Sequence, residues 1–416
     1  MNTAPPTQPG YRALLRMPGA ATFYFTATAG RIGLAMTGLG LVWLIHQRTD
    51  SFAAAGLVTG AFAVAEALAG PQLARLIDRF GQVRVLPPAV LTHAAAVSAL
   101  LLVPGTAPRW TLATCGALAG AAVPQLGALS AARWAALLRQ HKPAGPDSGT
   151  ADLTTPPGPQ ALPTAFSLES LANGTAFLIG PVLVTSLGAL DRPAAATALA
   201  TTLITVSGLS LAAQSRTAPP TVTDAVERTR AGRSLLRSGF ALVVALNLAI
   251  GVHFGAMGVS MTAFMLDHDA TTTAPAVFAA GSLSGLLAGW LYGLRRWQAA
   301  PSTQLPVAAG LLAAGTPLLL LAESPLQLAG AAALVEGMIP PLLVLFSLLT
   351  EATVHRAALT QALTWLNSAS AAGSAAAAAL AGHAVDVAGA DGGFALTTGA
   401  SLVMTALAAG WWATNR

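Results

Sequence analysis

Residues 20–45 read AATFYFTATAGRIGLAMTGLGLVWLI, which is an apolar run of the length that crosses a lipid bilayer. A membrane-spanning helix requires about 20 largely apolar residues. The run is also longer than the ~7–15 apolar residues of a cleavable signal peptide, so we expect it to remain in the protein. It therefore predicts a first membrane helix, and the one Lys, Arg, Asp or Glu within it is Arg31.

Eleven further stretches of this kind follow, so the sequence predicts an all-α membrane protein with twelve transmembrane helices. The composition agrees, because charged residues make up 9% and hydrophobic residues 54% of the chain. Ordinary soluble domains have ~25% and ~45–50%. A chain this apolar would expose large hydrophobic patches in water, whereas lipid requires such a surface. The predicted helices are Ala20–Ile45, Phe52–Leu76, Val85–Val103, Trp110–Leu138, Pro163–Leu190, Pro193–Ala213, Phe240–Leu266, Ala274–Leu294, Leu305–Ala322, Leu326–Leu349, Ala357–Val385 and Gly393–Thr414.

The basic residues give an independent test of this count. With a cytoplasmic N-terminus, seventeen of the 21 Lys and Arg lie in segments on the cytoplasmic side, three lie outside, and Arg31 lies within a helix. Such an excess on the inside follows the positive-inside rule, and a miscounted helix would have scrambled it. We therefore expect a multi-pass protein of the cytoplasmic membrane with both termini in the cytoplasm.

Two long polar segments interrupt the apolar pattern. Residues 141–160 are rich in Pro, Gly, Thr and Asp, and they predict a flexible connection between helices four and five. Residues 214–237 carry five Arg and separate an N-terminal six-helix bundle (residues 1–213) from a C-terminal one (residues 238–416). Arg pairs at the same cytoplasmic turn after helices two and eight indicate an internal repeat, which is typical of secondary transporters.

Residues 74–84 read ARLIDRFGQVR and form the predicted cytoplasmic loop between helices two and three. Gly81 suits a tight turn, because glycine adopts backbone conformations that other residues avoid. Arg79 and Arg84 would hold the loop at the membrane surface. Asp78, at a helix end, can pair with a cation on a neighbouring helix.

This segment resembles the G-x-L-x-D-R-x-G-R-R signature of the major facilitator superfamily. It departs from the signature at Ala74, where the family has Gly, and at Gln82, where Arg is usual. The resemblance implies two pseudo-symmetric six-helix bundles that expose a central site to each side in turn. It also implies that Asp78 takes part in a conformational latch, for which Arg133, at the cytoplasmic end of helix four, is the expected partner.

The resemblance extends over nearly the whole chain to a group of facilitator proteins from high-GC bacteria, most of them predicted exporters. The matching segments are Arg31–Met36, Ala131–Trp134, Ala165–Ser170, Gly180–Leu183 and Leu363–Trp365. Gly180 and Pro181 also resemble the core of the antiporter motif of helix five, which favours export over uptake. In that group, acids occur near Gly258, Gln361 and Asn173, where this chain is neutral, so proton coupling is absent here or depends on other residues.

Charged side chains inside the predicted helices are the strongest candidates for a functional site. Arg31 lies about 16 Å past Ala20 along the helix, near mid-bilayer, where an arginine costs at least ~2.5 kcal/mol and should face water or a counter-charge. It is either a substrate or counter-ion site or a structural ion pair, and Glu66, which lies one side-chain length away in depth, is a candidate counter-charge. Because an apolar environment favours a neutral carboxyl group, Glu66, Glu169 or Glu336 could carry a transported proton. The alternative is that these acids form hydrogen bonds that join helices.

Uncharged groups within the helices are further candidates. Asn173, Gln361 and Trp365 would line a transport pathway or join helices, and Gln125 offers the same two alternatives. We expect no cofactor and no metal site. The single cysteine, Cys115, excludes an intramolecular disulfide and a multi-cysteine metal site.

These features predict a secondary transporter that exports a small organic compound. The alternatives are an uptake carrier, or a receptor or sensor on the same fold that does not transport. An enzyme or an ATP-driven pump is disfavoured, because the sequence lacks an HExxH metal motif, a nucleophile elbow and a phosphate-binding loop. The expected partners are a small-molecule substrate, the lipid bilayer and, if transport is coupled, protons. We expect a monomer without a nucleic-acid partner.

Overall fold

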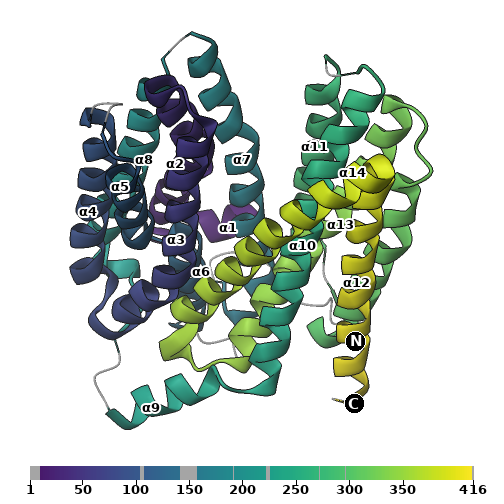
Figure 1. Cartoon of the computed structure of the whole chain (residues 1–416). Coiled ribbons are helices and arrows are strands. Elements are labelled where there is room, and N and C mark those ends of the chain that lie inside the picture. Colours follow the sequence, from purple (N-terminus) through teal and green to yellow (C-terminus); the bar gives the residue numbers. More distant parts are fainter. Residues whose placement is uncertain are drawn as a thin grey trace. The chain divides into compact units, whose positions relative to one another are not determined.

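The computed structural model describes residues 10–103, 107–140, 157–190, 192–221, 225–270, 272–295 and 297–414, and every element within these ranges is helical. Among these residues, ten helical segments are long and apolar enough to cross a membrane. The chain is therefore a multi-pass membrane protein, and Figure 1 shows how its helices are arranged along the sequence. Most of the predicted connection 141–160 lies outside the described residues, as do Lys142, Arg296 and Arg416.

The chain divides into two compact units. Unit 1 comprises Met1–Asp224 with Tyr292–Arg296, and unit 2 comprises Ala225–Leu291 and Trp297–Arg416. The helices that begin in unit 1 are α1 (Tyr11–Leu15), α2 (Ala20–Thr49), α3 (Phe52–Phe80), α4 (Gln82–Leu102), α5 (Arg109–Ala122), α6 (Leu126–Gln140), η1 (Pro159–Ala161), α7 (Leu162–Ala189), α8 (Pro193–Ala213) and η2 (Ser215–Thr217). Those that begin in unit 2 are α9 (Ala225–Ser234), α10 (Ser238–Asp267), α11 (Ala274–Leu294), α12 (Pro301–Gly315), η3 (Thr316–Leu319), α13 (Pro325–Thr353), η4 (Arg356–Ala358) and α14 (Leu359–Thr414).

Two irregular elements account for the difference between ten long helices and the predicted twelve spans. The 56-residue element α14 consists of two helices that meet at a kink, where Ala388 (φ −133°, ψ 17°) and Gly389 (φ 64°, ψ −163°) leave the helical conformation. It contains both of the last two predicted spans. The 15-residue helix α12 continues through η3, and together they cover residues 305–319 of the ninth predicted span. The fold is therefore all-α, with twelve transmembrane helices in two bundles of six.

The fourth predicted span contains a break. The sequence predicts one helix over Trp110–Leu138, but the structure divides it into α5 and α6, with Val123 in an extended conformation (φ −68°, ψ 125°). Pro124 explains the break, because it has no N–H to donate to the preceding turn and disfavours helical geometry at the residue before it. The predicted span is confirmed, because Arg109–Gln140 forms one segment long and apolar enough to cross a membrane, and the break at Pro124 lies within it.

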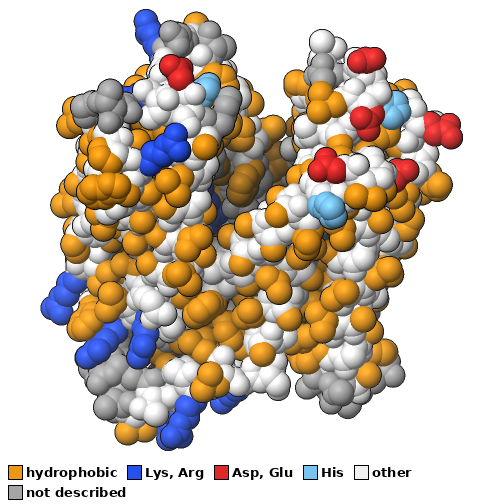
Figure 2. All heavy atoms as spheres, viewed as in Figure 1, with side chains coloured by type: hydrophobic (Ala, Val, Ile, Leu, Met, Phe, Trp, Pro, Cys, Tyr) orange, Lys and Arg blue, Asp and Glu red, His pale blue; other side chains and the backbone are white. Residues whose placement is uncertain are grey.

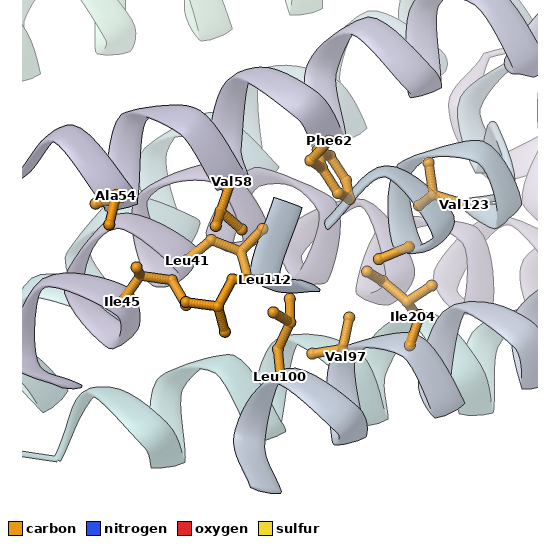
Figure 3. Packing of buried hydrophobic residues seen from close by; sticks show 13 residues of the cluster. Leu41, Ile45, Ala54, Val58, Phe62, Val97, Leu100, Leu112, Val123 and Ile204 are labelled. Carbon is orange, nitrogen blue, oxygen red and sulfur yellow. The ribbon is translucent and has the colours of Figure 1, made fainter. Parts of the chain in front are cut away.

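A hydrophobic core joins the membrane helices of unit 1, and its members point toward one another in Figure 3. Leu41, Val58 and Leu112, from α2, α3 and α5, are almost fully buried in it. The α3 and α5 backbones approach so closely that a Cβ atom at Gly120 would lie 2.1 Å from the carbonyl oxygen of Phe62. Small residues have this role in membranes, where lipid supplies no hydrophobic driving force between helices.

Unit 2 uses the same kind of packing between α10 and α14, which run side by side (Figure 1). A Cβ atom at Gly251 would lie 2.0 Å from the carbonyl oxygen of Ser370, and one at Gly255 would lie 2.2 Å from that of Ser374. The two glycines stand one helical turn apart, so they form a continuous face that admits the partner backbone.

Candidate functional site

Arg31 is the centre of a buried polar cluster in unit 1. Its guanidinium pairs with the carboxylate of Glu169 on α7. It also donates from Nη1 to the backbone carbonyl of Glu169 at 3.0 Å and from Nη2 to that of Gly127 on α6 at 3.3 Å. Ser130 of α6 donates to the second carboxylate oxygen of Glu169 at 2.7 Å. The cluster therefore joins three helices, α2, α6 and α7, through one ion pair.

Both charged side chains of this pair are buried. Arg31 is 6% exposed and Glu169 is 9% exposed, so both charges are withdrawn from bulk water. An uncompensated charge at this depth would be costly, and the ion pair together with its hydrogen bonds offsets that cost. Glu66 was the counter-charge predicted from depth alone, and this pairing was wrong, because the carboxylate beside Arg31 is Glu169.

Glu66 has a different partner, which the break between α5 and α6 supplies. The side-chain amide of Gln125 donates to Glu66 at 2.8 Å. Gln125 immediately precedes the first residue of α6. The break therefore places a side-chain amide donor beside an acid on α3.

Glu336 is the acid of unit 2, and its environment differs from those of Glu66 and Glu169. Its stem packs against α11, where a Cβ atom at Gly281 would lie 3.1 Å from Cγ of Glu336. Within the described ranges, its carboxyl group has no hydrogen bond or ion pair to another side chain. Pro340 and Pro341 follow within the same helix, so the helix supplies no N–H donor to the carbonyl groups of Glu336 and Gly337. Glu336 is thus an acid without a side-chain partner in the described ranges, and it lies beside two backbone carbonyl groups that lack their usual helical N–H donors.

The predicted latch loop forms a tight turn. Gly81 has φ +90°, a conformation that side chains disfavour, and it ends α3 directly before α4 begins. The guanidinium of Arg79 lies 4.8 Å from the ring centroid of Phe80, in a cation–π contact. Arg84 is exposed on the first turn of α4. The structure therefore gives the loop the turn that the sequence predicts.

Arg133 is fully buried at the same end of unit 1 and binds neutral acceptors. Its Nε donates to Oε1 of Gln82 at 2.7 Å, and Nη1 donates to Oγ1 of Thr217 at 2.7 Å. It also donates to the backbone carbonyls of Leu211 at 2.6 Å and Gln214 at 2.9 Å. The last carbonyls of a helix lack partners and carry partial negative charge, so Arg133 caps α8.

The contact with Gln82 explains a departure from the family signature. The signature has arginine at this position, and a second cation here would repel Arg133 in a buried environment. The neutral carbonyl oxygen of Gln82 instead accepts a hydrogen bond from it. The pairing of Asp78 with Arg133 remains a prediction.

The remaining candidates are dispersed. Asn173 is exposed on α7, and Gln361 and Trp365 lie one turn apart on α14, with Trp365 37% exposed. Gly180 allows α7 to approach α2, since a Cβ atom there would lie 2.8 Å from that of Ala35. Pro181 follows it within α7. No group of three or more His, Cys, Asp or Glu in the described part of the chain is arranged to hold a metal ion.

No family model matches the sequence, and no curated protein matches it. The human organic anion transporter MFSD10 has a similar structure, with TM-score 0.69 and 14% identity, and the match covers 96% of this chain and 100% of that one. A bacterial homologue of the iron transporter ferroportin, in an outward-facing state, matches with TM-score 0.74 and 13% identity over 95% of this chain and 99% of that one. The same homologue with soaked iron gives TM-score 0.68 and 13% identity, covering 94% and 98% of the two chains.

These similarities cover both bundles and agree with the twelve helices described above. At 13–14% identity they establish architecture rather than substrate. The protein therefore has the fold of the major facilitator superfamily.

Proposed function

We propose that the protein is a secondary transporter that moves a small organic compound across the cytoplasmic membrane by alternating access. The observation that carries this proposal is the buried Arg31–Glu169 pair with its partners on α6. Ionisable groups within membrane helices are rare, and they commonly mark substrate or ion pathways. On a facilitator-type fold, such a charged group in the N-terminal bundle supports a transport role.

We propose export as the direction, because Gly180 and Pro181 resemble the core of the antiporter motif. Export needs an energy source, and we propose a proton that enters against the substrate. Glu336 is the preferred carrier, because Glu169 is engaged by Arg31 and Glu66 by Gln125. A carboxyl group without a partner can change its protonation state without breaking an ion pair.

A ligand is identified first by screening organic compounds for stabilisation of the full-length protein in detergent. A compound at a hundred times its Kd should raise the free energy of unfolding by about 2.7 kcal/mol. Transport of that compound is then measured in proteoliposomes under an imposed pH gradient.

Replacing Glu336 by glutamine should abolish proton movement driven by that ligand, while ligand binding changes little. The carboxamide keeps the shape of the side chain and cannot exchange a proton at neutral pH. A pH-sensitive dye inside the vesicles reports the proton flux. Glu323→Gln is the matched control, because Glu323 is an exposed acid just before α13. Normal proton flux in Glu336→Gln would remove Glu336 from the coupling mechanism.

We propose that both termini lie in the cytoplasm, as the excess of basic residues on that side supports. Reporter fusions at Asp147, which lies outside the described residues, and after Arg416 should both report a cytoplasmic location. A periplasmic signal at either position would contradict this orientation.

A further inference from the structure

We propose that α9 is an interfacial helix whose exposed arginines bind the headgroups of anionic phospholipids in the cytoplasmic leaflet. This inference depends on the orientation proposed above, but it does not depend on transport. It rests on three observations within unit 2: the contacts that fix one face of α9 to the turn containing η4, the exposed arginines on the adjoining face, and the short connection between α9 and the membrane helix α10.

One face of α9 is fixed to the turn that contains η4. Glu227 pairs with Nη2 of Arg356 at 2.8 Å and lies 3.8 Å from Nε2 of His355. Ser234 accepts a hydrogen bond from the backbone N–H of His355 at 2.9 Å. Ala231 is 5% exposed and Ser234 is 2% exposed. Positions 227, 231 and 234 are four and three residues apart, so they share one face of the helix, and their contacts set its rotation.

The adjoining face is basic, and Arg230 and Arg233 on it make no hydrogen bond or ion pair to another residue that the structure describes. Arg230 and Arg233 are exposed and three residues apart, so they lie side by side on the helix surface. Leu236 follows them and is 85% exposed. Arg237 is also exposed, and its Nη1 lies 3.5 Å from the carbonyl oxygen of Thr353. Arginines beside a highly exposed leucine are typical of a segment that lies in the headgroup layer.

The chain holds this face close to the bilayer. Residues 235–237 alone connect α9 to α10, and three residues span at most about 10 Å. The turn that fixes α9 connects two membrane-spanning elements, α13 and α14. Because α9 is joined to α10 at its end and fixed to this turn along its side, it must lie near the level of the headgroups.

The positive charge at the end of unit 2 that contains α9 favours an anionic partner. Figure 2 shows Lys and Arg side chains at the end of unit 2 where Figure 1 places α9, and Asp and Glu side chains at the other end. The cytoplasmic leaflet is negatively charged, and it attracts basic segments beside a membrane helix. Arginine also matches the planar geometry of phosphate oxygens. A lipid phosphate is therefore the expected ligand, with Leu236 inserted between the lipid chains.

The test compares the full-length protein in nanodiscs of phosphatidylcholine alone with nanodiscs that also contain phosphatidylglycerol. Hydrogen exchange at residues 225–237 should slow when phosphatidylglycerol is present. In native mass spectrometry, the wild type should retain phosphatidylglycerol in preference to phosphatidylcholine. Each arginine removed should weaken that retention about five-fold, because a basic residue near an anionic surface contributes about 1 kcal/mol.

The key variant carries Arg230→Gln, Arg233→Gln and Arg237→Gln, and it should lose both effects. The matched control carries Arg12→Gln, Arg16→Gln and Arg75→Gln, which removes the same charge from exposed positions of unit 1. An equal loss in the control would overturn the proposal, because total charge rather than α9 would then explain binding. Unchanged retention in the α9 variant would also overturn it. Displacement of the lipid by soluble glycerol phosphate at equal concentration would indicate a soluble-anion site and overturn the lipid assignment.

Discussion

Replacing Arg31 by alanine should abolish transport of the ligand and lower the free energy of unfolding by about 3 kcal/mol. Breaking a buried ion pair from one side costs about 3–5 kcal/mol, because the remaining charge is left without compensation. We expect the low end of this range, since Glu169 can become neutral by binding a proton. Thermal unfolding in detergent measures stability, and proteoliposome flux measures transport. Arg48→Ala is the control on the same helix, where Arg48 donates to the carbonyl groups of Leu100 and Val103 near the end of α2.

The double variant Arg31→Met with Glu169→Met separates a functional pair from a structural one. Apolar residues of similar volume often replace a buried ion pair without loss of stability. The double variant should therefore regain much of the stability of the wild type but remain inactive in transport. Transport near the wild-type rate in the double variant would show that the pair only joins helices, which was the structural alternative for Arg31.

Replacing Arg133 by alanine should destabilise unit 1 by several kcal/mol, because each buried acceptor left without a donor costs about 1–3 kcal/mol. Lysine should not rescue this variant, since one ammonium group cannot reach the spread acceptors that the planar guanidinium contacts. Gln82→Arg, which restores the family residue, should destabilise as well by placing a second cation against Arg133. Arg139→Ala is the control on α6, where an exposed side chain should change stability by less than about 0.5 kcal/mol.

A substitution of Asp78 should affect turnover rather than stability, in contrast to Arg133→Ala. If it acts as the latch, Asp78→Asn should slow turnover while leaving ligand affinity and stability near their wild-type values. A variant with normal turnover would make the loop between α3 and α4 structural only. Loss of stability equal to that of Arg133→Ala would assign Asp78 to the same structural cluster instead.

Much of the fold could be predicted from hydropathy and from the distribution of Arg. Each membrane span can be recognised as a long apolar run, because a helix that crosses the hydrocarbon layer needs both that length and that composition. The break at Pro124 could not be predicted in this way, since the apolar run continues across it. Membrane helices also tolerate proline well, as Pro71 within α3 shows. A proline therefore does not by itself reveal where a helix divides.

The site could be predicted less completely, because counting residues gives depth but not neighbours. Glu66 and Glu169 lie at similar depth, and the sequence offers no way to choose between them as the partner of Arg31. The choice depends on how α6 packs, since Gly127 and Ser130 complete the cluster around Glu169. The role of Gln82 was missed for the same reason, although its departure from the family signature was visible in the sequence.

Counterflow tests most directly whether the protein is an alternating-access carrier. Proteoliposomes are loaded with a high concentration of the unlabelled ligand and diluted into a low concentration of the labelled form, with no ion gradient. A carrier that exposes its site to each side in turn should accumulate labelled ligand inside the vesicles, transiently above the external concentration. The Arg31→Ala variant should not. Ligand binding without such an overshoot would contradict the account and favour a receptor or sensor on the same fold.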